Sequence, residues 1–440
     1  MTTDNSPVRY CCPGEEHPIP RSVHLSRLAS FFPKCRDCRH RDDTGQLTRQ
    51  TLEAIASTRK RVERPTLFTD EGVRGVHLNE LTRKRAADLA GALASLLWQD
   101  RPLRGRRRSS PPVNPSPSRP AGPAVVVGYD PRPSSPDIVA GVVAALVRMG
   151  CRVIELGRVS GPCLQFAVDH LQAAAGLFVT GAGHPAAWTG LDAVVAAGRP
   201  LSRGGGLERW EARVAGGFAR PTRRSGSRRA FRATPVYEAA LGKHFDSLPP
   251  LTVSIGCPAG PVTDTLVRSF AHRPVRLDLL EPPLGPPSPT FRTRLAESVR
   301  RQGAVAGVLC HDDAGRIDVL DEQGQPVPVK TVARLLGEAV LAEKPAGAVI
   351  LAEQAGKEFE ADVVEAGGYV RWAGSGLAAT WRAMRDHQAV FASDAEGRYW
   401  FHEAAPTCDA VVTIGRLLEA LARARCPLSQ ATAGSGEPTG

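Results

Sequence analysis

The sequence predicts an α/β protein of three consecutive α/β/α domains with mixed or parallel sheets, preceded by a small Cys-rich module. Three observations indicate this class. The chain has 440 residues, enough for about three domains of roughly 100 to 200 residues each. Short β-branched runs alternate with helical patterns, as in parallel strands joined by crossover helices. Hydrophobic residues make up 42% and charged residues 23%, which excludes collagen, coiled-coil rods and wholly disordered chains.

Residues 1–63 form a predicted separate module that is rich in Cys and His. Its candidate metal ligands are Cys11, Cys12, Cys35, Cys38, His17, His24 and His40. The CxxC spacing at 35–38 supplies half of a tetrahedral zinc site, and a metal would replace the apolar core that so short a segment lacks. We predict that Cys12, Cys35 and Cys38 bind Zn²⁺ with either His24 or Cys11. Unliganded thiols and a redox pair are the alternatives.

Residues 64–203 have the pattern of a first α/β/α domain. A β-branched run at 124–130 predicts a buried strand, and helical spacing follows at 137–150, with Ser134 or Ser135 as N-cap. A strand at 151–157, a helix at 164–176 and a strand with its loop at 177–185 come next. The Pro-, Ser- and Arg-rich stretch 101–123 interrupts this domain as a loop or disordered insert.

The second half of the chain repeats the alternation of strands and helices. An Arg-rich segment at 204–233 lacks periodicity and is interpreted as an interdomain linker. Further α/β/α domains are predicted at 234–323 and 326–425. The small, polar tail 426–440 is expected to be disordered.

The chain is basic, but its composition does not favour nucleic acid as a partner. The formal net charge is +11, and only seven of the 56 basic residues are Lys. Such an Arg bias favours a compositional property of the source over a polyanion-binding surface, although Arg binds phosphate well. The apolar runs are too short to span a bilayer, and the first residues lack the features of a secretory signal. We therefore expect a cytoplasmic protein without a membrane partner.

Four segments, in order along the chain, carry a family resemblance. LFTDEGVRG at 67–75 resembles FGTDGIRG with one extra residue, and VVVGYDPRPSSP at 125–136 matches GxDxRxSS. ELGRVSGPCLQFAV at 155–168 resembles LGxVPTPxxxFAV, and the segment 381–401 resembles a stretch that leads into a sugar-recognition loop. From Leu67 to about Ser429, the chain resembles the α-D-phosphohexomutases, the family of phosphoglucomutases and phosphomannomutases.

The resemblance implies a phosphoryl-transfer site whose nucleophile is altered here. In the family a phosphoserine in TASHNP passes its phosphoryl group to a hexose phosphate, which requires a nucleophile, a cation and phosphate clamps. The corresponding segment is TGAGHP, and the serine position is Ala182. Thr180 and His184 are the substitutes that could accept a phosphoryl group; His184 as an ordinary loop residue is the plainer interpretation.

The family's metal and sugar loops are also altered. Its DGDADR loop holds Mg²⁺ with three carboxylates, but here only Asp313 and Arg316 are retained in HDDAGR, so Mg²⁺ is not expected to bind. Cys310, His311 and Asp313 as a softer metal site is an alternative. In the sugar loop, Asp394 stands where the family has Glu and Arg398 replaces His; a similar AEQAGK at 352–357 is interpreted as coincidental.

These changes predict a degenerate phosphohexomutase without mutase activity. The family's fourth, phosphate-gripping domain is expected to be absent, since SGEP at 435–438 would lack a folded support. Arg74, Arg316, Asp394 and Arg398 remain as candidates for binding a sugar phosphate. The function expected is that of a regulator or scaffold in hexose phosphate metabolism, acting through a sugar phosphate or a protein partner. An enzyme with a non-standard site, and a nucleic-acid- or partner-binding protein using the zinc module and Arg segments 101–108 and 220–232, are the alternatives.

Overall fold

In a computed structural model, the chain forms an N-terminal module followed by three large β-sheets. The structure describes residues 9–59, 66–100, 122–245, 248–352, 357–402, 407–424 and 427–433. The module contains an antiparallel strand pair, two helices and one 3₁₀ turn, with the bounds β1 (Arg9–Tyr10), β2 (Ile19–Pro20), α1 (Arg21–Ala29), η1 (Pro33–Cys35) and α2 (Arg49–Arg59). The insert at 101–121, the motif-like 353–356 and the tail 434–440 lie outside the described residues.

Sheet I has the strand order β3-β7-β6-β4-β5-β9, with β8 paired to β7. Its strands are β3 (Val73–Val76), β4 (Ala124–Tyr129), β5 (Arg152–Arg158), β6 (Ala175–Val179), β7 (Trp188–Val195), β8 (Arg199–Pro200) and β9 (Ser227–Ala230). Its helices are α3 (Arg83–Gln99), α4 (Ser135–Arg148), α5 (Gly161–His170) and α6 (Leu207–Ala215), with the turn η2 (Ala196–Gly198). Strands β6, β4, β5 and β9 run parallel, whereas β7 is antiparallel to β3 and β6.

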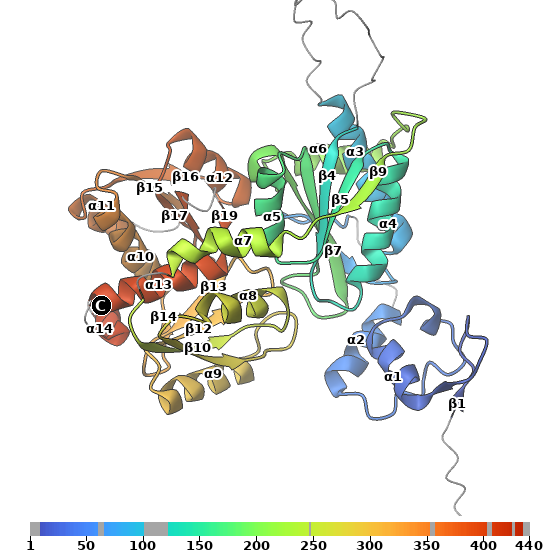
Figure 1. The fold of residues 1–440 in the computed structure, drawn as a ribbon, viewed down its shortest axis with the longest axis horizontal. Helices are drawn as coiled ribbons and strands as arrows, with labels where there is room; N and C mark the ends of the chain where they lie inside the picture. Colours follow the sequence, from blue (N-terminus) through green and yellow to red (C-terminus); the bar gives the residue numbers. More distant parts are fainter. Residues whose placement is uncertain are drawn as a thin grey trace, which may run out of the picture.

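Successive side chains of β4 point to opposite faces of sheet I, and helices cover both faces. Val125 and Val127 pack in the core beneath α3, α4 and α6, whereas Val126 packs in the core on the side of α5. Figure 1 shows α5 on one side of the sheet and α4 on the other. Because successive strand residues point to opposite faces, an uninterrupted apolar run is what a doubly covered strand requires. The expected α/β/α layering is therefore present in sheet I.

Sheets II and III share one topology. Sheet II has the order β11-β10-β12-β13-β14 and sheet III the order β16-β15-β17-β18-β19, each with three parallel strands followed by two antiparallel ones. The strands are β10 (Leu251–Gly256), β11 (Val275–Leu280), β12 (Ala306–Cys310), β13 (Ile317–Leu320), β14 (Pro326–Val327), β15 (Ala348–Ala352), β16 (Tyr369–Ala373), β17 (Phe391–Ser393), β18 (Tyr399–Phe401) and β19 (Thr407–Cys408). In each sheet a tight loop joins a parallel strand to its antiparallel partner. These two equivalent loops, 311–316 and 394–398, become important below.

Helices pack around sheets II and III. They are α7 (Thr234–Leu241), α8 (Pro261–Phe270), α9 (Pro289–Gln302), α10 (Val329–Glu343), α11 (Lys357–Glu365), α12 (Leu377–Asp386), α13 (Ala410–Ala424) and α14 (Leu428–Ala433), with the turn η3 (Gly242–His244). Ser160 and Ser288 cap α5 and α9 by accepting the backbone N–H groups of Cys163 and Phe291. Ser202 also accepts the N–H of Ala378 at 3.1 Å, which joins sheet I to the start of α12.

Three local expectations differ from the structure. The tail expected to be disordered from residue 426 contains α14, whose Leu428 is buried and whose Ser429 donates its backbone N–H to Glu322 at 3.2 Å. The segment 204–233 is not a simple linker, because it contains α6 and the edge strand β9. Trp210 of α6 is fully buried and donates its indole N–H to the carbonyl of Leu89 at 2.9 Å, so one anchoring side chain places this Arg-rich stretch on sheet I. The helix expected at 164–176 ends at His170, since Ala175 begins β6.

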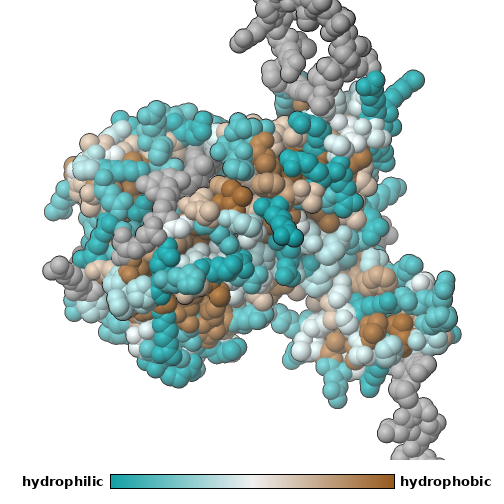
Figure 2. All heavy atoms as spheres, in the orientation of Figure 1, coloured by the Kyte–Doolittle hydropathy of each residue, from teal (hydrophilic) through white to brown (hydrophobic). Residues whose placement is uncertain are grey.

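In the described part of the chain, no helix has the length and apolar character needed to cross a membrane. Figure 2 shows hydrophilic side chains over much of the visible face, with hydrophobic residues in separate patches. The cores instead lie between the sheets and their helices, where Val126, Phe245 and Phe391 belong to one continuous cluster.

Candidate active site

The loop between β6 and β7 carries the position of the family nucleophile, and Asp130 organises it. Asp130 follows β4 directly, and its carboxylate accepts the Thr180 hydroxyl at 2.9 Å and the Gly181 N–H at 3.1 Å. It also accepts the Ser135 hydroxyl and the N–H of Arg132. Ser135 therefore bonds to the strand end instead of capping α4, and Ser134 makes no side-chain cap bond either. The GxDxRxSS segment acts as a scaffold for this loop.

Arg132 and Asp312 tie the same loop to sheet II. The fully buried Arg132 donates to the carbonyls of His184 and Pro185, each at 2.9 Å, and to the carboxylate of Asp312. Asp312 accepts the N–H of Gly183 at 2.8 Å. The loop is thus held from both sides by charge-assisted hydrogen bonds. Asp312 was not among the residues predicted to form the site.

Ala182 stands at the position where the resemblance places the nucleophile, and it lines a cleft between the three sheets that is described below. It is buried, and its carbonyl accepts the Arg74 Nε–H at 3.3 Å. Arg74 also donates to Asp192, with an Nη2 to Oδ2 distance of 3.0 Å. Arg74 therefore lies beside the nucleophile position, as the resemblance implies.

The two substitute acceptors are placed less favourably. The Thr180 hydroxyl is fully buried, donates to Asp130 and accepts the N–H of Ala182 at 3.0 Å. The His184 imidazole stacks on Trp188, with ring centroids 4.4 Å apart, and its Nδ1 lies 3.2 Å from the carbonyl of Ala182. Among the described residues, the cleft lining includes Thr180 and Ala182 but not His184.

In the loop 311–316, the carboxylates are engaged with the protein itself. Asp313 accepts the N–H groups of Gly315 and Arg316 at 2.9 and 3.1 Å, and Arg316 Nε at 2.5 Å. Burial would raise the pKa of Asp313, but Arg316, Arg398 and the Gly315 N–H together lower it below its usual value. The ionised carboxylate is therefore stabilised by Arg316 without a metal.

The alternative metal group at 310–313 does not assemble. Cys310 is buried against Cys257, and the His311 imidazole lies 3.2 Å from Asp318. Asp313 instead faces Arg316. These three side chains point to three different partners, because β12 ends at Cys310 and the chain then turns through the loop 311–316.

The loop 394–398 repeats this arrangement in sheet III. Asp394 accepts the N–H of Arg398 at 3.0 Å and its Nη1 at 3.1 Å, so Asp394 orients Arg398. The other guanidinium nitrogen, Nη2, donates to Glu71 at 2.5 Å. Burial would lower the pKa of Arg398, but Glu71, Cys408 and Asp394 together raise it above its usual value. An isolated β-bridge pairs Arg316 with Arg398, which brings the two equivalent loops together.

One cleft gathers these groups from all three sheets. Its charged lining residues are Glu71, Arg74, Asp192, Asp313, Arg316 and Arg398. Three of the four predicted phosphate-binding residues line it, and Asp394 holds one of them. The three arginines face three carboxylates, so the cleft has no large excess of positive charge.

Glu71 and Asp192 are the charged groups lining this cleft that the sequence prediction missed. Burial raises the pKa of the Glu71 carboxyl, although Arg398 and Arg316 lower it in part. Glu71 lies next to Gly72 in the segment LFTDEGVRG, which is one residue longer than the family motif. That extra residue was the available signal, whereas nothing in the sequence pairs Glu71 with Arg398.

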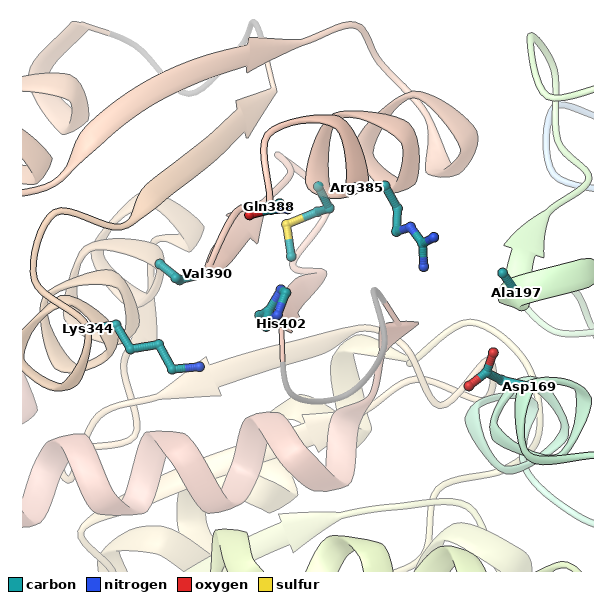
Figure 3. Close-up of a pocket in the computed structure, with 8 residues that line it drawn as sticks. Asp169, Ala197, Lys344, Arg385, Gln388, Val390 and His402 are labelled. Carbon is teal, nitrogen blue, oxygen red and sulfur yellow. The ribbon is translucent and has the colours of Figure 1, made fainter.

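A second hollow, of about 670 Å³, lies between sheet I and the elements of sheet III. Figure 3 shows Lys344, Arg385 and His402 around it on one side, with Asp169 and Ala197 on the other. None of the predicted site residues lines it. Its size alone therefore does not make it the candidate active site.

The residues predicted to bind zinc lie in the N-terminal module, with Cys12 and Cys38 in one small apolar cluster and Cys35 in another. Cys12, Cys35, Cys38 and His24 are buried, whereas Cys11 is exposed. Burial, followed by the neighbouring thiols of Cys12 and Cys38, raises the pKa of Cys35 to about 11. Among the described residues, no three His, Cys, Asp or Glu side chains already stand as a metal-binding group. Zinc binding therefore stays a prediction.

The Arg-rich segments give no support for a nucleic-acid site. Residues 101–108 lie outside the described part of the chain. Within 220–232, Arg228 forms an ion pair with Glu155, its Nη2 being 2.9 Å from the carboxylate. This segment also supplies β9, so part of it contributes to sheet I.

The sequence matches one protein family and several curated proteins. Residues 114–204 match the family described as phosphoglucomutase/phosphomannomutase, alpha/beta/alpha domain I. Proteins described as phosphohexose mutases from Xanthomonas campestris pv. campestris are 29% identical over 291 residues, covering 63% of this chain and 65% of the relative. The chain thus spans slightly less than two thirds of their length. A probable phosphoglucosamine mutase from Methanothermobacter thermautotrophicus is 27% identical over 388 residues, covering 84% of this chain and 78% of the relative.

Two solved structures show the same fold. A phosphoglucomutase/phosphomannomutase family protein from Burkholderia thailandensis superposes with a TM-score of 0.72 at 22% identity, covering 84% of this chain and 80% of that one. A putative phosphomannomutase from Thermus thermophilus gives a TM-score of 0.68 at 23% identity, covering 85% and 84%. The likeness therefore extends over the three sheets and not only over the matched first domain.

Proposed function

Because this chain belongs to the α-D-phosphohexomutase family, we propose that it binds a hexose phosphate in the cleft between its sheets but does not catalyse mutase turnover. The observation that carries this proposal is Ala182. Its methyl group stands at the nucleophile position, beside Arg74. A methyl group has no lone pair with which to accept a phosphoryl group, so the first step of the family reaction has no acceptor there.

The metal loop supports the same conclusion. Mg²⁺ prefers an octahedral set of oxygen ligands, but Asp313 already accepts bonds from Gly315 and Arg316, and Asp312 accepts bonds from Gly183 and Arg132. Coordination would require breaking at least one of these ion pairs. The residues present fit an internal ion-pair network better than an Mg²⁺ site, and we propose that the chain does not use this ion.

The cleft arginines support phosphosugar binding. Arg74, Arg316 and Arg398 converge on it, and guanidinium groups can pair with phosphate through two parallel hydrogen bonds. A bound phosphate would compete with Glu71, Asp192 and Asp313 for these donors. We therefore propose binding that is weaker than an unpaired set of arginines would give. Zinc binding by the N-terminal module is a separate proposal that does not depend on this cleft.

A paired measurement tests binding and turnover. The purified chain is mixed with glucose 1-phosphate or mannose 1-phosphate, with a hexose bisphosphate activator and Mg²⁺, and product is followed by NMR. Thermal shift is measured with the same sugar phosphates and with unphosphorylated glucose. We expect stabilisation by the phosphates alone, up to about 3 kcal/mol at 100-fold excess over Kd, and no product. Turnover that disappears in His184→Ala would overturn the proposal, as would the absence of stabilisation by any phosphosugar.

Ala182→Ser separates the nucleophile from the rest of the machinery. The hydroxyl restores an acceptor, but the Asp313–Arg316 pair and Glu71 remain in the cleft. Catalytic groups that act as a unit are strongly non-additive, so we expect unchanged phosphosugar binding and no measurable turnover. Robust mutase activity in this single variant would show that the metal and sugar loops are still competent.

A further inference from the structure

We infer that the N-terminal module holds one Zn²⁺ ion between the sulfur atoms of Cys12, Cys35 and Cys38 and the Nδ1 atom of His24. These residues come from three segments: the turn after β1, helix α1 and the turn that follows α1. The fold buries all four together, although 26 residues separate Cys12 from Cys38. None of these four residues lines the cleft, and the site is tested independently of phosphosugar binding.

The distance between Cys12 Sγ and His24 Nδ1 is close to the distance between two ligand atoms of a tetrahedral zinc site. Cys12 Sγ lies 3.9 Å from His24 Nδ1. Zn–S and Zn–N bonds of about 2.3 and 2.0 Å at a tetrahedral angle place sulfur and nitrogen roughly 3.6 Å apart. Cys12 and Cys38 lie within hydrogen-bonding reach of each other, and Cys35 lies close to both. Since no complete ligand group stands ready among the described residues, the ion has to draw these side chains together, which for Cys12 and His24 means closing 3.9 Å to roughly 3.6 Å.

The environment of His24 selects the nitrogen that faces the thiols. His24 Nε2 lies 2.8 Å from the carbonyl oxygen of Asp43. A carbonyl can only accept, so Nε2 carries the proton and Nδ1 keeps a lone pair toward Cys12. Tyr10 stacks on the imidazole with ring centroids 4.1 Å apart and an interplanar angle of 8°. A second-sphere carbonyl that fixes the tautomer and a ring that fixes the orientation are typical supports of a metal-bound histidine.

The CxxC turn has a matching support for a thiolate. The N–H of His40 lies 3.5 Å from Cys38 Sγ, and the N–H of Cys38 bonds to the Cys35 carbonyl at 3.4 Å. A backbone N–H directed at sulfur stabilises its ionised, metal-binding form. Cys11 points to solvent, so His24 and not Cys11 completes the proposed tetrad.

Zinc would also stabilise the packing behind the candidate active site. Among its described residues, the module has two small apolar clusters, and one of them joins Phe31 and Ile55 of the module to Ala187 in the loop after β6. The Arg36 side chain also donates to the carbonyl of Leu78, just after β3. A module with so little core gains much of its stability from a bound ion. Loss of zinc is therefore expected to weaken the contact with the loop that contains Ala182.

Metal content of the full chain tests the site. Protein expressed with zinc and purified without chelators is analysed by mass spectrometry for metals, beside Cys38→Ser and Cys11→Ser. We expect about one equivalent of zinc in the unmodified chain and in Cys11→Ser, and less than about 0.2 equivalents in Cys38→Ser. Less than that amount in the unmodified chain, or loss of zinc in Cys11→Ser, would overturn the assignment.

A second readout starts from the unmodified chain, where it does not depend on whether a variant folds. Replacing zinc by Co²⁺ in the unmodified chain should produce the visible bands of a tetrahedral ion and sulfur-to-cobalt charge transfer in the near ultraviolet. His24→Cys should keep a tetrahedral spectrum with stronger charge transfer, whereas His24→Ala should weaken binding. A six-coordinate cobalt spectrum, or an unchanged spectrum in His24→Cys, would refute the proposed ligand set.

Discussion

Replacing Glu71 by Gln should strengthen phosphosugar binding, because Glu71 is an anion inside a cleft proposed to receive one. Its carboxylate pairs with Arg398, and Arg316 lines the same cleft. Glutamine keeps the size of the side chain and one oxygen that can accept a hydrogen bond from Arg398, but it removes the charge. Arg398 stays charged and oriented in the variant, since Asp394 accepts two further hydrogen bonds from the same residue.

The expected gain follows from Coulomb's law with a discount for solvent. Two unit charges about 6 Å apart interact by roughly 3 kcal/mol at an effective dielectric constant of 20. The Glu71 side chain is 36% exposed, so screening is expected to remove about half of this energy. The remaining 1.4 kcal/mol or so corresponds to about a tenfold lower Kd.

Calorimetric titration with glucose 1-phosphate measures this effect directly, with Glu211→Gln as a control. Glu211 also pairs with an arginine, Arg203, but lies outside the cleft. The pKa of Glu71 is raised mainly by burial, so protonation at falling pH should make the unmodified chain approach the Glu71→Gln variant. Equal or weaker binding by Glu71→Gln at pH 7, or a ratio of the two Kd values that does not shrink at lower pH, would refute the electrostatic reasoning.

Two further predictions concern stability. Asp312→Asn should lower the free energy of unfolding by about 2 kcal/mol, because the fully buried Arg132 loses one of its two carboxylate partners while Asp130 stays 3.1 Å from its Nε. Glu155→Gln, which breaks the partly exposed pair with Arg228, should cost less than about 1 kcal/mol in the same urea titration. A similar cost for both would contradict the role given to Asp312. Burial raises the pKa of Asp409 from 3.8 to about 6, so the folded state binds the proton more tightly and stability should fall by up to roughly 3 kcal/mol as pH rises from about 4 to about 6. Urea titrations at both pH values should show this loss of unfolding free energy in the unmodified chain and not in Asp409→Asn.

Local sequence patterns anticipated the strands better than the connections. The run at 124–130 became β4 because alternate residues enter two different cores, a property that a short segment can express by itself. The end of α5 was misplaced because Ala173, Ala174 and Ala175 are good helix formers. Pairing of Ala175 with Val125 across sheet I outweighs that preference.

In the segment 204–233, regular structure was missed where it exists. Its Arg-rich composition resembles a linker, and its edge strand β9 has no buried residue that could have marked it. One fully buried Trp210 and the pairing of β9 with β5 decide its place. A composition averages over a segment, whereas a single anchoring side chain can determine where the segment packs.

The sequence alone determined which residues stand at each position of the family motifs: Ala182 for the nucleophile, Asp313 and Arg316 in the metal loop, and Arg398 in the sugar loop. It also identified the CxxC pair, since each of these signals lies within a few neighbouring residues. Only the tertiary structure decided that Glu71 pairs with Arg398, that Asp312 ties Arg132 to the loop after β6, and that His24 instead of Cys11 faces Cys12. The physical reason is range: motif and periodicity report on chain neighbours, while the charge balance of a cleft depends on side chains that meet only when separate sheets pack together.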